Sequence, residues 1–173
     1  MISLTAICEQ LARQATTIAA LTDGIDDSQA TLRLKPGEWN MLEVMCHLYD
    51  EEINDFRIRV IQTVTQPTLP LPAIDPEAWV ISHQYASQSF TQIRNRFLAA
   101  RAESITLLQS LLTPDWQTSL NHPILHELRA GDVVWSWLGH DMLHIRQLNE
   151  LWYLYTIACA SPWKIGYAGD WEA

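Results

Sequence analysis

Apolar residues recur every three or four positions along four stretches of the chain, which is the spacing of one face of an α-helix. The first stretch stops near Gly24, because glycine favours the end of a helix, and the second stops before Pro67, which cannot continue one. The pattern therefore predicts four amphipathic helices. These helices are expected at residues 4–22, 40–66, 86–112 and 132–158.

Three segments lack the helical period. Residues 66–79 contain four prolines, so their first part is expected to be extended and to cross the end of the molecule, or to form a lid. Residues 116–131 include Pro123 and Gly131, which predicts a loop or a short hairpin. The tail at 161–173 is aromatic without helical order.

Four amphipathic helices without a convincing alternating strand indicate an all-α protein. The chain has 173 residues, which suits a single domain over 1–173 whose tail is less regular. We therefore predict a four-helix bundle with a long crossover connection between helices two and three.

Charge and hydropathy exclude several classes of partner. The chain carries 11 Lys and Arg against 20 Asp and Glu, a formal charge of −9, and no basic cluster, so nucleic acid is not expected. No segment reaches the roughly 18 uninterrupted apolar residues of a membrane helix, and the start lacks the pattern of an export signal. Three scattered cysteines argue against a disulfide framework and fit the cytoplasm.

Two histidines, His140 and His144, occupy apolar-stripe positions of the last predicted helix. Positions four apart differ by about 40° around a helix axis, so both rings project from one face and could bridge one divalent ion. His47, on the second predicted helix, could complete a three-imidazole site with open coordination positions. Spacing alone leaves open the alternative of core histidines satisfied by hydrogen bonds.

The other candidates for metal ligands are weaker. His122 and His126 are also four apart, but Pro123 and the missing apolar period make a helix, and hence convergence, unexpected there. His83 is interpreted as a surface or hydrogen-bonding residue. Cys46 adjoins His47, but neighbours point about 100° apart on a helix, so Cys46 is interpreted as a small buried hydrophobe.

Two strings in the sequence carry a family resemblance. The segment 39–48, WNMLEVMCHL, places Trp39 eight residues before His47, and the segment 140–148 reads HDMLHIRQL. Together with the Ile74-Asp75-Pro76 turn, they resemble the DinB-like superfamily over nearly the whole chain.

The resemblance implies a four-helix bundle in which His47, His140 and His144 bind a divalent metal, zinc or nickel, commonly in a homodimer. The resemblance also implies an activity on small molecules. That activity is metal-dependent hydrolysis, or a transfer or isomerisation that uses a low-molecular-weight thiol. Arg129 departs from the family, whose members often have Ser or Thr there. We therefore expect Asp132 to take over the capping role and the start of the last helix to be shifted.

Several residues are candidates for supporting roles. Glu51, four residues after His47, is expected to be a fourth ligand, an acceptor for an imidazole N–H or a general base. It belongs to an acidic cluster, Asp50, Glu51, Glu52 and Asp55, most of which is expected to face solvent. Asp141 and Gln147 could orient the imidazoles through hydrogen bonds. Trp137 is expected to border the metal cavity.

Three functions remain open from the sequence. The first is a metal-dependent enzyme, a hydrolase or a thiol-dependent transferase, acting on a small-molecule substrate. The second is a non-catalytic metal-binding or stress-response bundle. The third is a helical interaction protein with buried histidines and no ion. No site role is predicted for Arg57, Arg59 and Arg146, because exposed arginines usually form weak ion pairs.

Overall fold

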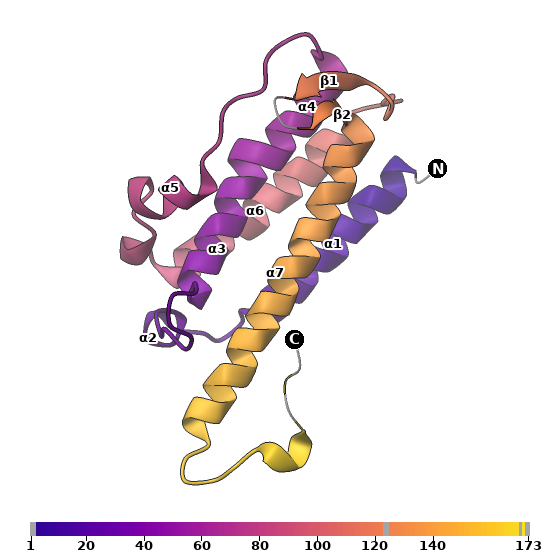
Figure 1. The fold of residues 1–173 in the computed structure, drawn as a ribbon. Coiled ribbons are helices and arrows are strands. Elements are labelled where there is room, and N and C mark those ends of the chain that lie inside the picture. Colours follow the sequence, from indigo (N-terminus) through magenta and orange to yellow (C-terminus); the bar gives the residue numbers. More distant parts are fainter. Residues whose placement is uncertain (1–2, 123–124, 170, 172–173) are drawn as a thin grey trace.

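A computed structural model describes residues 3–122, 125–169 and 171. The chain start, the middle of residues 116–131 and parts of the tail, at 1–2, 123–124, 170 and 172–173, lie outside the described residues. Long helices run side by side as a bundle (Figure 1), which confirms the predicted all-α class. They are α1 (Leu4–Leu21), α3 (Met41–Asp50) with its continuation α4 (Arg57–Thr65), α6 (Phe90–Gln109) and α7 (Ala130–Cys159).

Local sequence sets where the helices begin. Ser3 accepts a hydrogen bond from the backbone N–H of Ala6 at the start of α1. Asn40 and Glu43 form a reciprocal capping box at the start of α3, which fixes the turn that leads to His47. One apolar cluster packs α3 against α6, and a second packs α1 against α7 and α4.

The second predicted helix contains a π-helical segment, Glu51–Phe56, between α3 and α4. Its wider turn changes the faces on which the following residues lie. The expectation that most of the acidic cluster faces solvent is wrong, since all four carboxylates are buried, at 6% exposure or less. Asp50, Glu52 and Asp55 have polar partners inside the bundle, which offset the cost of burial. Those partners include Tyr85, Arg59 and Arg101.

The proline-rich connection joins α4 to α6 and is non-helical in its first part, as predicted. It begins with a turn, in which the Leu69 N–H donates to the Gln66 carbonyl, and it then runs along the side of the bundle and not across its end (Figure 1). It then forms two short helices, α5 (Pro76–Ser82) and a 3-10 turn (Tyr85–Ser87), and α5 lies beside α3 (Figure 1). That turn makes α6 start at Phe90, later than predicted. A further short helix, α2 (Asp27–Ala30), was not predicted.

A short antiparallel hairpin precedes the last helix, where the sequence predicted a loop or a short hairpin. Its strands are β1 (Ser119–His122) and β2 (His126–Arg129). The last helix starts at Ala130, two residues earlier than expected, because Arg129 occupies the N-cap position. Asp132 does take part in capping, since its Oδ2 accepts the backbone N–H of Arg129 at 3.0 Å.

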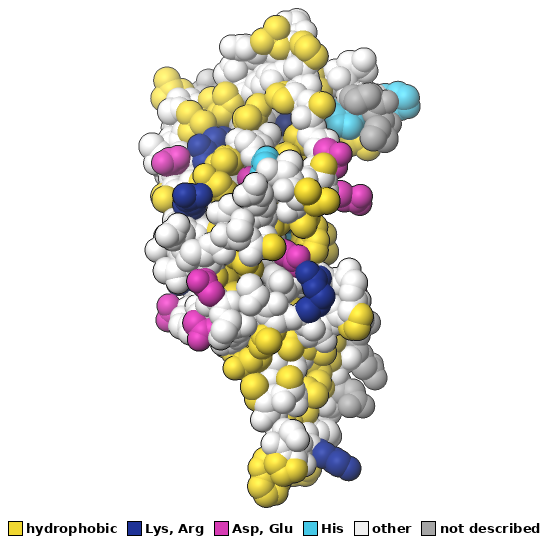
Figure 2. Space-filling model, turned by 90° about the vertical axis from the view of Figure 1, so that its left-hand side faces the viewer, with side chains coloured by type: hydrophobic (Ala, Val, Ile, Leu, Met, Phe, Trp, Pro, Cys, Tyr) yellow, Lys and Arg dark blue, Asp and Glu magenta, His cyan; other side chains and the backbone are white. Residues whose placement is uncertain are grey.

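The far end of α7 extends beyond the other helices, and the tail that follows contains a 3-10 turn, Gly166–Ala168 (Figure 1). Hydrophobic side chains gather at this end of the molecule (Figure 2), where Ile157, Trp163 and Tyr167 are exposed. Among the described residues, no helix is both long and apolar enough to span a bilayer.

Candidate metal centre

Three histidines from two helices meet inside the bundle. α3 supplies His47, which is 6% exposed, and α7 supplies the half-buried His140 and His144. The Nε2 atom of His140 lies 3.1 Å from Nε2 of His47 and 3.1 Å from Nε2 of His144. Among the described residues, this is the one group of His, Cys, Asp or Glu side chains whose ligand atoms cluster in this way, all within 4.8 Å of one another.

The spacing suits a transition-metal ion. Tetrahedral coordination with Zn–N bonds of about 2.0–2.1 Å places ligand nitrogens about 3.3 Å apart, close to the two separations found here. His144 Nδ1 lies 2.8 Å from Gln147 Oε1, an acceptor, so Nδ1 carries the proton and Nε2 presents its lone pair. A cation among the three Nε2 atoms would accept this lone pair.

Burial keeps these imidazoles neutral. Burial, with a smaller contribution from the nearby His144, lowers the pKa of His47 to about 3 and that of His140 to about 2. The pKa of His144 is also lowered, chiefly by burial. Neutral imidazole is the form that binds metals, so the site is in its ligating state at neutral pH.

Glu51 lies on the outer side of the His47 ring, away from the other histidines. Its Oε1 is 4.0 Å from His47 Nδ1, which is buried and has no hydrogen-bond partner. Burial raises the pKa of Glu51 to about 7, although nearby Arg59 opposes the rise. This position suits an acceptor that orients His47.

Aromatic rings form the walls beside the histidines. The Trp39 ring lies 4.7 Å from that of His47, and the Phe56 ring lies 5.0 Å from that of His140. Phe56 in turn stacks on Trp137. Trp137 was predicted to border the metal cavity, but Phe56 takes that place because the π-helical segment turns it towards α7, and Trp137 is fully buried behind it.

The two predicted orienting residues differ in outcome. Gln147 contacts His144, as expected, whereas Asp141 is turned away from the imidazoles and receives two hydrogen bonds from Arg101. The roles of Arg101 and its second partner, Glu52, were missed. Arg101 lies four residues after the buried Phe97, so the helical period could have indicated its burial, but it could not have indicated its partners.

The weaker candidates for metal ligands lie elsewhere. His122 and His126 pair across the hairpin, and His83 contacts Asp50 Oδ2 through Nδ1 at 2.7 Å. Cys46 is buried in the apolar core, and burial raises the pKa of its thiol to about 12, which confirms its interpretation as a small hydrophobe.

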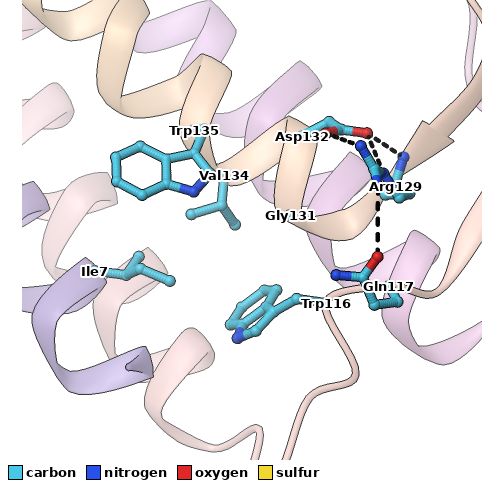
Figure 3. Close-up of a pocket in the computed structure, with 8 residues that line it drawn as sticks. All are labelled: Ile7, Trp116, Gln117, Arg129, Gly131, Asp132, Val134 and Trp135. Carbon is cyan, nitrogen blue, oxygen red and sulfur yellow. Dashed lines mark hydrogen bonds and ion pairs between the residues drawn. The ribbon is translucent and has the colours of Figure 1, made fainter. Parts of the chain in front are cut away.

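A separate cavity of about 220 Å³ lies at the start of α7, where Ile7, Trp116 and Trp135 face one another beside the Arg129–Asp132 ion pair (Figure 3). The described residues that line it include no histidine. We therefore place the candidate site at the three histidines and not in this cavity.

Comparisons with known proteins agree with the helical-bundle fold. YfiT from Bacillus subtilis, a probable metal-dependent hydrolase with an unusual four-helix bundle topology, has a similar structure, with a TM-score of 0.78 and 18% identity over 95% of this chain and 92% of its own. A mycothiol-dependent maleylpyruvate isomerase matches with a TM-score of 0.66 and 13% identity, over 85% of this chain and 61% of its own. At these identities the likeness establishes the fold alone.

No curated protein matches the chain. A family model does match, over residues 10–148, which is most of the sequence. The chain belongs to the DinB superfamily.

Proposed function

We propose that the chain is a metal-dependent enzyme in which His47, His140 and His144 hold one divalent ion, zinc or nickel. The convergence of their Nε2 atoms, with two separations of 3.1 Å, is the observation that carries the proposal. Three protein ligands leave at least one coordination position for water or substrate, which is typical of catalytic sites. When bound, the ion supplies Lewis-acid activation of a water or a thiol.

The side chains around the histidines have distinct proposed roles. Gln147 fixes the tautomer and the ring orientation of His144 through Nδ1. Glu51 accepts the Nδ1 proton of His47 after a small shift or through a water, which is the role its 4.0 Å separation supports best. Trp39 and Phe56 exclude water from one side of the centre.

Two reactions on a small-molecule substrate fit this centre. YfiT supports a hydrolase, and the mycothiol-dependent isomerase supports a thiol-dependent transferase or isomerase. The alternative is a non-catalytic metal-binding or stress-response bundle, in which the ion holds α3 and α7 together.

Assays of wild type and His140→Ala with ester, amide and thiol-conjugation substrates test for catalysis. The enzyme proposal predicts metal-dependent turnover of at least one class, lost in the variant. A silent panel, together with metal-dependent stability, would favour the binding-protein alternative.

We further propose a homodimer in the cytoplasm. The exposed Ile157, Trp163 and Tyr167 at the projecting end of α7 offer an apolar surface for a second copy. The three cysteines are free, two of them buried, which fits a reducing compartment. Sedimentation of the purified chain tests the dimer, and a monomer at micromolar concentration would contradict it.

A further inference from the structure

A buried arginine links α7, which carries His140 and His144, to the π-helical segment that continues α3. Arg101 lies on α6, which contributes no histidine, and it is 1% exposed. Its Nη1 and Nη2 donate to the two carboxylate oxygens of Asp141 at 2.6 and 3.0 Å, and its Nε donates to Oε2 of Glu52 at 2.9 Å. The indole N–H of Trp137 donates to the same Glu52 oxygen at 3.2 Å.

Both carboxylates are next to residues of the proposed centre. Asp141 directly follows His140 on α7, and Glu52 directly follows Glu51 in the π-helical segment that continues α3. Arg101 therefore binds one carboxylate on α7 and one in the π-helical segment after α3. Such a link restrains the rotation of α7 relative to the end of α3. The planar guanidinium makes this link directional, since its donors have a fixed geometry.

Metal coordination is sensitive to such a rotation. Side-chain atoms lie about 5–6 Å from a helix axis, so a rotation of about 10° displaces them by about 1 Å. Metal–ligand distances tolerate only about 0.2 Å. A small rotation of α7 would therefore move His140 and His144 out of register with His47.

We propose that Arg101 is a positioning residue for the three-histidine centre, through its bonds to Asp141 and Glu52. This inference rests on the proposed metal site. It assigns to Arg101 a function beyond stability, since two helices could be held together by apolar packing without a directional polar link.

Arg94 provides a matched control on the same helix. Its side chain also bonds buried and backbone groups, donating to Thr22 Oγ1 at 3.1 Å and to the Ala19 carbonyl at 3.0 Å. Those partners belong to α1 and the residue that follows it, neither of which carries a histidine of the centre. A lysine at either position keeps the charge and loses the planar fork.

The test compares Co²⁺ binding to wild type, Arg101→Lys and Arg94→Lys, with circular dichroism to show that each is folded. Affinity is measured by competition with a chromophoric chelator, and the visible spectrum of bound Co²⁺ reports its coordination geometry. We expect Arg101→Lys to bind about 10–100-fold more weakly with an altered spectrum. Arg94→Lys should keep the wild-type affinity and spectrum, even if it is less stable.

A folded Arg101→Lys with wild-type affinity and spectrum would overturn the inference and leave the metal site intact. If Arg101→Lys does not fold, Asp141→Asn replaces it in the test, with Co²⁺ affinity and the visible spectrum as readouts. This variant weakens the same Arg101–Asp141 interaction by changing its acceptor. A wild type that binds no Co²⁺ would instead overturn the proposed centre itself, and this inference with it.

Discussion

Glu51 Oε1 lies 4.0 Å from Nδ1 of His47, while Nε2 of the same ring faces the other two histidines. The carboxylate therefore stands behind the His47 ring and not in the space that the three Nε2 atoms share. The arrangement resembles the carboxylate–histidine–metal triads in which the outer acceptor holds the imidazole in its ligating tautomer.

Replacing this carboxylate should weaken metal binding without abolishing it. We expect Glu51→Gln to lower zinc affinity by about 10-fold, because the amide is a weaker acceptor for the His47 N–H. Competition with a chromophoric chelator measures the change. Glu103→Gln, at an exposed position on α6, is the control and should bind as wild type does. An unchanged affinity in Glu51→Gln would contradict the orienting role.

Metal removal should destabilise the protein, because the ion binds a site that exists only in the folded state. Free zinc at 100 times its dissociation constant should add about 2.7 kcal/mol to the free energy of unfolding, by mass action. Thermal denaturation with zinc and with a chelator measures the difference. The stabilisation should be absent in His140→Ala, and a variant that gains as much as wild type would count against His140 as a ligand.

The metal-free protein should lose stability as the pH falls below about 6.5. Histidines in an unfolded chain take up protons near that pH, whereas burial holds the folded-state pKa of His47 at about 3 and that of His140 at about 2. Between these values the unfolded state binds more protons, so acidification favours unfolding. Glu51, with its pKa raised to about 7, acts in the opposite direction and offsets part of this loss.

His140→Gln isolates the histidine contribution to this pH dependence. Denaturant unfolding of the two metal-free proteins from pH 7 to pH 4.5 should give a shallower fall in the free energy of unfolding for the variant. Parallel curves would show that His140 does not resist protonation in the folded state.

The crossover connection should depend on one buried hydrogen bond. Tyr85 is 1% exposed, and its hydroxyl donates to Asp50 Oδ2 at 2.8 Å. Tyr85→Phe removes a hydrogen bond to a carboxylate, and we expect it to lower the free energy of unfolding by about 1.5–3 kcal/mol. Urea denaturation measures this cost. Tyr167→Phe, at an exposed position, should have almost no effect, and equal effects would contradict the anchoring role of Tyr85.

Helical periodicity was enough to predict the bundle and to place His140 and His144 on one face of the last helix. The prediction that His47 lies beside them needed the family resemblance. Spacing within one helix carries no information about a residue 93 positions away. The structure places the three side chains together, but the metal itself stays a prediction.

The missed features depend on tertiary packing. A π-helical turn leaves no period of its own, so the burial of Glu52 and the place of Phe56 beside His140 could not be read from the pattern. The interior role of Arg101 depends on two carboxylates 40 and 49 positions away. Its sequence neighbours on α6 give no sign of either partner.

Elemental analysis of the untagged protein, purified after metal supplementation, tests the central claim most directly. We expect about one equivalent of a divalent transition metal per chain in wild type and in His126→Ala, whose substitution lies in β2 of the hairpin, and loss of it in His144→Ala. Less than about a tenth of an equivalent in wild type, or full metal content in His144→Ala, would contradict the three-histidine centre.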